Sequence, residues 1–320
     1  MHALLAQLAE GRLTKMKHGG LFCKILTSHL LPAVLVSLLT GCGGAEPVLP
    51  QRYAESDALM TQLSDNIDRA SNLEIVADID HSRLADEAGS PMPPARVMIF
   101  SDAQLESELI GLNPLVALDL PLRVLAYETD GGRSNQVIFN SFDYLVSRYQ
   151  LNADQTSAAR AHYESDIALV TKGISSEAIA AFASDEMQPD GIITIQSPYG
   201  FQETVDRVNA AIDAQNDTVQ FGTVDFEANA EKLGIDLAPS LLILFGGPGP
   251  GGKAMAQAPT LGLDGFCQKF LIWQDSNGRT NLSFNDLLAL ADRQGAHKAL
   301  ALRVIDFRLT KTFSDALSPD

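Results

Sequence analysis

The sequence is poor in positive charge. It has 23 Lys and Arg residues against 40 Asp and Glu, and its formal net charge at pH 7 is −17. A surface of this sign repels phosphate backbones, so the composition argues against a nucleic-acid partner. The acidic residues are spread along the chain, which is typical of a solvated surface that keeps a protein soluble.

Cysteine is also scarce. Of the three, Cys23 and Cys42 lie near the start, and Cys267 stands alone in the rest of the chain. No disulfide within the folded part is therefore expected. Cys267 follows Phe266 and precedes a predicted strand, which favours a buried structural thiol. A reactive thiol is the alternative, and it needs positive charge beside it.

Histidine is equally sparse beyond residue 42, where His81, His162 and His297 lie far apart. The sequence contains no Ser-His-Asp, Glu-x-x-His or Cys-x-x-Cys arrangement. We therefore predict no catalytic residue, no bound metal and no cofactor. Asp78, Asp80 and His81 adjoin at a predicted strand end, where a solvated edge is favoured over a site for a hard metal ion.

The longest apolar run, Ile25 to Leu39, is too short for a permanent transmembrane helix, and Pro32 interrupts it. Lys17 and Lys24 lie before or at its start, and small residues follow it. A basic start, an apolar core of roughly 7 to 15 residues and a small-residue end are typical of a secretory signal peptide.

Leu39-Thr40-Gly41-Cys42 resembles the bacterial lipobox. The resemblance implies cleavage before Cys42 and acylation of its sulfur and amine. Two acyl chains hold a protein on a membrane where one does not. Gly43 in place of Asp points to the outer membrane, with the protein facing the periplasm. We predict a signal peptide over residues 1–41, with Met16 as an alternative start, and a tether over 42–52. An ordinary signal peptide with a coincidental cysteine is the alternative.

The rest of the chain contains two similar copies of one pattern, and matching residues lie at a constant offset of 145. A period this long indicates a duplicated domain, because solenoid units run roughly 20 to 50 residues. The matching pairs include Phe100 and Phe245, Pro114 and Pro259, Leu118-Asp119 and Leu263-Asp264, Asp130 and Asp275, and Phe139-Asn140 and Phe284-Asn285.

Hydrophobic periodicity in each copy predicts helices alternating with short strands and a closing hairpin. The first α/β copy is expected over residues 53–150 and the second over 191–320, with a C-terminal helix. Residues 151–190 are rich in alanine and predict a helical connector, divided into two helices near Gly173.

A glycine-rich turn in the second copy, Gly247 to Lys253, fits G-x-x-x-x-G-K between a strand and a helix. Ala254 removes the hydroxyl that holds Mg²⁺, and Pro248 and Pro250 lack N–H donors, so a nucleotide partner is not expected. A tight turn that permits close packing is favoured. A turn that binds a small ligand or anion is the alternative, using Gly246, Gly247, Gly251, Gly252 and Lys253.

Asp119 and Asp264 recur at the same place in both copies. A carboxylate that caps nearby backbone N–H groups is the favoured interpretation, and a functional acid is the alternative.

The second copy runs Phe-Gly-x-Pro from Phe245, then Ala-Pro-x-Leu-Gly-Leu-Asp up to Asp264, then a strand with Trp273. These motifs resemble the bacterial family called domain of unknown function 302, well over residues 191–295 and more weakly over 52–150. The resemblance implies α+β domains of β-α-β4-α type, similar to the TATA-binding-protein architecture. Family members often pair, so tandem copies imply a pseudo-dimer.

The first copy departs from the family pattern. It has Phe100-Ser101-Asp102 where the family has Phe-Gly-x-Pro, and its first strand would fall on residues 46–53. The second copy has Gly265-Phe266 where Leu-Pro is usual. The family brings no activity or catalytic residues with it.

We therefore expect a membrane-anchored lipoprotein whose partners are the membrane, through lipid on Cys42, and a small ligand or an envelope protein. The favoured function is a non-catalytic module for ligand binding or envelope maintenance. One alternative is an enzyme with a site near the Gly246–Lys253 turn and Asp264, and the other is a scaffold for a protein partner.

Overall fold

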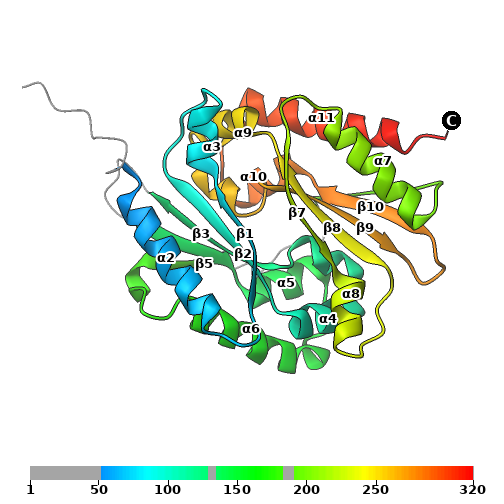
Figure 1. The fold of residues 1–320 in the computed structure, drawn as a ribbon, viewed down its shortest axis with the longest axis horizontal. Coiled ribbons are helices and arrows are strands. Elements are labelled where there is room, and N and C mark those ends of the chain that lie inside the picture. Colours follow the sequence, from blue (N-terminus) through cyan, green and yellow to red (C-terminus); the bar gives the residue numbers. More distant parts are fainter. Residues whose placement is uncertain (1–51, 129–134, 183–190, 320) are drawn as a thin grey trace, which may run out of the picture. The chain divides into compact units, whose positions relative to one another are not determined.

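The computed structural model describes residues 52–128, 135–182 and 191–319. All of these belong to one compact unit of the chain. They form two five-stranded sheets with helices packed around them, which is the expected α+β class (Figure 1). The predicted signal peptide, Cys42 and nearly all of the predicted tether lie outside the described residues.

The first sheet has the order β1-β2-β3-β4-β5. Its neighbours are antiparallel except for β4 and β5, which are parallel. The elements of this copy are α2 (Ala54–Asp68), β1 (Glu74–Asp80), α3 (His81–Glu87), β2 (Ala95–Ser101), α4 (Ala103–Leu112), η1 (Pro114–Leu118), β3 (Leu122–Glu128), β4 (Asn135–Asn140), α5 (Phe142–Tyr149), η2 (Ala153–Gln155), α6 (Ser157–Val170), η3 (Ser176–Ala178) and β5 (Ile179–Phe182).

The second sheet has the order β6-β10-β9-β8-β7, with every pair antiparallel. The elements of this copy are β6 (Ile192–Gln196), α7 (Phe201–Asp213), β7 (Val219–Asp225), α8 (Phe226–Lys232), β8 (Ser240–Gly246), α9 (Pro248–Met255), η4 (Pro259–Gly262), β9 (Gln268–Gln274), β10 (Thr280–Asn285), α10 (Leu287–Arg293) and α11 (Leu300–Ala316).

The duplication is visible residue by residue. The bounds of β1, α3, β2 and β4 recur 145 residues later as those of β7, α8, β8 and β10. The strand register repeats too, since Asp80 lies opposite Arg96 and Asp225 lies opposite Leu241. Even the irregularity between Ile75 and Ala77 returns at the same offset.

The two copies differ at one sheet edge. In the second copy β6 comes before the first helix and runs antiparallel to β10. In the first copy β5 takes this place, comes after α6 and runs parallel to β4. Residues 46–51 of the expected first strand lie outside the described residues, and α2 begins directly after Tyr53.

The connector is helical over α6, as predicted, but its predicted second helix is wrong. Residues 179–182 form β5 instead. Their sequence, Ile-Ala-Ala-Phe, is short and apolar, and the exposed backbone groups of β4 offer it a full hydrogen-bonding partner. Strand formation depends on such tertiary context more than on the helix propensity of alanine.

The helices cover the outer faces of the sheets. Met60, Leu63 and Ile67 of α2 are buried against β2 and β3. Val205, Val208 and Ile212 of α7 are buried in the same way over the second sheet, as their spacing predicts. Figure 1 shows α2 with α6 on one side and α7 with α11 on the other.

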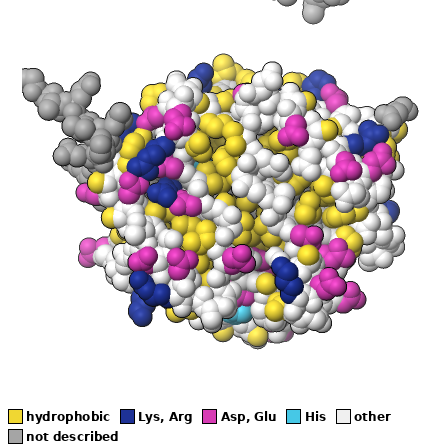
Figure 2. Space-filling model, in the orientation of Figure 1, with side chains coloured by type: hydrophobic (Ala, Val, Ile, Leu, Met, Phe, Trp, Pro, Cys, Tyr) yellow, Lys and Arg dark blue, Asp and Glu magenta, His cyan; other side chains and the backbone are white. Residues whose placement is uncertain are grey.

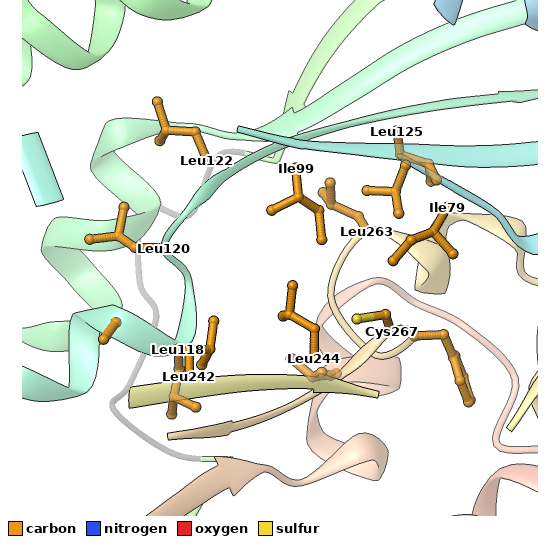
Figure 3. Close-up of a cluster of buried hydrophobic side chains, with 14 of the residues drawn as sticks. Ile79, Ile99, Leu118, Leu120, Leu122, Leu125, Leu242, Leu244, Leu263 and Cys267 are labelled. Carbon is orange, nitrogen blue, oxygen red and sulfur yellow. The ribbon is translucent and has the colours of Figure 1, made fainter. Parts of the chain in front are cut away.

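The inner faces meet each other in a shared core. The contacts are reciprocal: η1 packs on β8 and β9, and η4 packs on β2 and β3. Figure 3 shows Leu118 beside Leu242, and Leu263 among Ile99 and Leu125 of the first copy. Each fully buried leucine contributes about 1.5–3 kcal/mol. The copies therefore form the predicted pseudo-dimer.

Two helix pairs and one strand pair complete the contact between the copies. Helix α3 packs against α9, α4 packs against α8, and β1 lies beside β7. Across the ranges that the structure describes, none of the helices is both long and apolar enough to span a membrane.

Candidate functional site between the two copies

The recurring acids Asp119 and Asp264 lie in the core between the copies. Each follows a short 3₁₀ helix, η1 or η4, and precedes the strand β3 or β9. Both carboxylates are fully enclosed, with 0% of the side chain exposed. The 3₁₀ helices pack on the opposite copy, and this packing carries both acids into a single buried network.

Asp119 binds two guanidinium groups and a phenol. Its Oδ1 accepts from Arg123 at 2.8 Å, and its Oδ2 accepts from Arg148 at 2.7 Å and from Tyr149 at 2.7 Å. Burial alone would raise the pKa of Asp119, but the charges of Arg148 and Arg123 outweigh it and hold the pKa well below its ordinary value. Asp119 is therefore a fixed negative charge.

Asp264 is held from both copies. Asn140 of the first copy donates to its Oδ1 at 3.0 Å, and Arg123 lies 3.5 Å away. Arg293 of the second copy lies 2.5 Å from its Oδ2. The sequence predicts that these two carboxylates cap nearby backbone N–H groups. Instead, the hydrogen bonds that they accept in this network come from side chains.

Two helix ends supply two of the three guanidinium groups, and Arg123 on β3 supplies the third. Ser141 caps the start of α5, and Asp286 caps the start of α10. These caps place Arg148 and Arg293 in the last turns of their helices. Arg148 reaches Asn285 of the other copy at 2.6 Å, and Arg293 reaches Tyr144 of the first copy.

Lys269 adds a fourth cation to the network. It is only 3% exposed, and among the residues described no group accepts a hydrogen bond from its Nζ. Burial lowers its pKa to about 7, and the neighbouring Arg123 acts in the same direction. The carboxylates of Asp264 and Asp119 oppose this shift without cancelling it.

Positive charge thus exceeds negative charge in this core. Three guanidinium groups and Lys269 face two carboxylates. In the described part of the chain, several buried nitrogens of the network have no hydrogen-bond partner: Arg123 Nη1, Arg148 Nε, Lys269 Nζ, Asn285 Nδ2 and Arg293 Nε. Figure 2 shows basic side chains scattered among acidic ones on the face it presents.

A small cavity is lined by two of the residues that carry these unpartnered nitrogens. It is lined by Lys269 and Asn285 together with Asp264, Phe284 and Leu287, and its volume is about 10 Å³. That is near the minimum that one water molecule needs. The site can therefore hold a water-sized species, but an organic molecule does not fit.

The glycine turn lies elsewhere. A Cβ on Gly252 would meet Ala85 Cβ at 2.5 Å and the Ser90 carbonyl oxygen at 2.6 Å, so this glycine lets α9 approach α3 closely. Gly251 is buried at the same helix, and Lys253 is exposed.

The remaining glycines of that turn sit at the start of α9. A Cβ on Gly246 would meet the Phe221 ring at 3.2 Å, and one on Gly247 would meet the Asp217 carbonyl oxygen at 3.0 Å. Gly247 also lines a cavity of about 30 Å³ with Arg308, separate from the one at Asp264. The turn and Asp264 therefore do not share one cavity.

The other residues that the sequence singled out have structural roles. Cys267 is buried as predicted, and burial raises its pKa to about 12. His81 is buried against the carbonyl oxygen of Gly262, and burial lowers its pKa to about 4. Asp80 accepts from Arg83 and caps α3, while Asp78 pairs with Arg96, so these acids do not converge with His81 on one point.

Sequence reasoning missed the basic half of the network. Arg148 and Arg293 lie 145 residues apart, so the offset that paired the two acids also pairs these arginines. Arg123 and Lys269 are harder to find. They occupy equivalent strand positions, opposite Ile99 and Leu244, but lie 146 residues apart because β9 is displaced by one residue.

A family model matches the chain twice. Domain of unknown function DUF302 covers residues 51–167 and 193–311, which together are most of the chain. The chain belongs to this family. The first match contains β1 to β4 and extends through most of α6, but it ends before β5. The second contains β7 to β10, nearly all of β6 and most of α11.

Part of the chain is similar to two proteins of known sequence and to one solved structure. "Fluoride-specific ion channel FluC 1" of Brucella suis biovar 1 (strain 1330) is 37% identical over 103 residues, 32% of this chain and 40% of that protein. The protein of the same name in Brucella abortus biovar 1 (strain 9-941) is 37% identical, over 37% of its length. The match thus spans about two fifths of these relatives.

The third is a solved structure, "Crystal structure of uncharacterized conserved protein DUF302 from Bacillus stearothermophilus". It is 17% identical and aligns over 40% of this chain and 96% of its own, with a TM-score of 0.34.

Proposed function

We propose that this chain is a lipid-anchored envelope protein whose paired domains bind a small anion, without catalysis, in the buried network between the copies. The observation that carries the proposal is the excess of buried positive charge beside a water-sized cavity. Three arginines and Lys269 surround two carboxylates. An uncompensated buried charge is costly, and an anion that accepts from Lys269 Nζ and Asn285 Nδ2 would offset that cost.

The size of the cavity narrows the ligand to a compact inorganic anion. Fluoride is close to water in size and is the first anion to test, because the relatives named above are called fluoride-specific ion channels. Chloride and nitrate are larger and serve as size controls.

The test is thermal unfolding of the full chain with sodium fluoride, chloride or nitrate at one ionic strength. An anion that binds only the folded state at 100 times its Kd stabilises by about 2.7 kcal/mol. Fluoride should raise Tm in the wild type and in Lys253→Met, the exposed lysine of the glycine turn. Lys269→Met should remove the increase. No anion-specific increase in the wild type, or an increase that survives in Lys269→Met, contradicts the proposal.

Catalysis on an organic substrate is less well supported. A lysine with a pKa near 7 is a common feature of catalytic sites. The cavity that this residue lines nevertheless takes only a water-sized species.

The membrane anchor rests on the Leu39–Cys42 motif. Lipid on Cys42 would hold the domains at the periplasmic face of the outer membrane, with residues 42–52 as tether. Cys42→Ser should move the protein from the membrane fraction to the soluble periplasmic fraction. A variant that stays on the membrane argues for a different anchor.

A protein-partner scaffold is the second candidate. On α11, Leu300, Val304 and Phe307 are 76%, 56% and 69% exposed. Their spacing puts them on one helix face, and an apolar face of this kind is typical of an interaction surface. Phe307→Ser should abolish cross-linked adducts that form through this helix in native membranes, and an unchanged adduct pattern removes this candidate.

A further inference from the structure

A second cluster of ionisable groups lies in the first copy, where α4 packs against α6. It joins Asp102 at the start of α4 to His162 and Asp166 on α6, with Asn72 beside them. His162 and Asp166 are four residues apart, so they share one helix face. α4 packs against α6, which brings Asp102 to that face.

The three potential ligand atoms converge. His162 Nε2 lies 3.0 Å from Asp102 Oδ2 and 3.9 Å from Asp166 Oδ2, and all three lie within 4.8 Å of one another. Two ligands of a tetrahedral ion at roughly 2.1 Å are about 3.4 Å apart. The first two separations bracket that value.

The carboxylates are held in place, and one of their oxygens has no hydrogen-bond partner among the described residues. Asp102 and Asp166 are each 1% exposed. Asn72 Nδ2 donates to Asp102 at 2.6 Å and to Asp166 at 3.0 Å, and Asp102 Oδ1 also accepts from the backbone of Leu105. Asp166 Oδ2 is buried, and within the described ranges it accepts no hydrogen bond. Two buried acids thus face one point with at most one positive charge beside them.

The fold does not require this cluster. The second copy builds the equivalent helices α9 and α11 with Gly247, Phe307 and Lys311 at the positions of Asp102, His162 and Asp166. The side chains that converge in the first copy are therefore additional to what the architecture needs.

We propose that Asp102, His162 and Asp166 form a site for one divalent first-row transition-metal ion, with Zn²⁺ as the representative ion. One imidazole and two carboxylates are ligand types that Zn²⁺ accepts. The His162 side chain is 30% exposed, which leaves an entry path and room for water as a further ligand. Asn72 orients both carboxylates, as outer hydrogen-bond partners of metal ligands commonly do. The bound ion would tie α6 to the start of α4.

The experiment is calorimetric titration of the full chain with Zn²⁺ after treatment with EDTA, with metal content measured after dialysis. We expect one equivalent per chain in the wild type and in His297→Gln, a control at an exposed histidine of the second copy. His162→Gln and Asp166→Asn should each weaken Zn²⁺ binding by about tenfold or more.

A second readout separates metal loss from misfolding. Asp166→Asn removes a buried charge, so in EDTA its Tm should equal or exceed that of the wild type, while the Tm increase with Zn²⁺ should be lost. Failure of the wild type to bind Zn²⁺ would overturn the proposal. So would undiminished binding in both His162→Gln and Asp166→Asn.

Discussion

The two copies share their elements but not all of their chemistry, and the difference follows position. Between the copies, part of the buried network is the same in both. Three pairs at the common offset carry the same residue type: Asp119 and Asp264, Asn140 and Asn285, Arg148 and Arg293. These pairs make hydrogen bonds across the contact. Their role in holding the two copies together therefore explains why both copies carry the same residue types at these positions.

At the starts of α4 and α9 the copies differ. The first copy caps α4 with Asp102 and joins it to His162, whereas the second begins α9 at Gly247, which has no side chain to cap it. Beside Gly247 lies a cavity with an exposed ion pair between Asp217 and Arg308. The copies therefore carry different polar groups at this pair of equivalent helix starts.

The largest expected effect is at Asp119. Asp119→Asn removes the charge that neutralises Arg123 and Arg148, both buried, and should lower the free energy of unfolding by about 3–5 kcal/mol. Asp264→Asn should cost less, because the side chain of its partner Arg293 is 13% exposed and can regain water. Urea unfolding of both variants measures the difference. Equal losses of unfolding free energy in the two variants would contradict this difference between Asp119 and Asp264.

The next largest effect is a difference in stability between substitutions at Lys269 and at its structural equivalent Arg123. Lys269→Met should raise the free energy of unfolding at pH 6 by about 1–4 kcal/mol in the absence of a binding anion, because it removes an unpartnered buried charge. Arg123→Met should instead destabilise, because Arg123 pairs with Asp119 at 2.8 Å. Denaturant unfolding in a buffer free of small anions tests both variants.

This gain should depend on pH. The unfolded chain holds the lysine proton up to about pH 10.4, whereas the folded protein releases it near pH 7. Between these values the unfolded state binds more protons, so wild-type stability rises with pH and the advantage of Lys269→Met shrinks from pH 6 to pH 9. A constant advantage would mean that Lys269 is not desolvated.

The smallest effect tests close packing on one side of the contact. Gly252→Ala should destabilise by about 1–3 kcal/mol, because its Cβ would clash with Ala85 and with the Ser90 backbone. Gly249→Ala on the same helix is the matched control, since its Cβ would lie an ordinary 3.5 Å from Ala88. Thermal unfolding compares the two, and equal Tm values would contradict the packing role of Gly252.

The duplication made most of the fold predictable. The offset and the hydrophobic spacing indicated the strands and helices of each copy, and the resemblance to the family implied the pairing of the copies. β5 was not predictable, because Ile179–Phe182 becomes a strand only through the free edge of β4.

The site was predictable in part. Asp119 and Asp264 stand out because they repeat, and the repeat of Arg148 and Arg293 carries the same signal. The equivalence of Arg123 and Lys269 depends on strand register, which the offset does not reveal. The Asp102 and His162 cluster joins residues about sixty positions apart, so no local motif marks it.

The central claim is that Lys269 is a buried cation that binds an anion. The most direct measurement is the pKa of Lys269 by NMR titration of the lysine side chains, with its signal assigned from its loss in Lys269→Met. We predict a pKa near 7 without anion and a higher value with saturating fluoride, because a bound anion favours the charged form. A pKa near 10 that fluoride leaves unchanged would contradict the account.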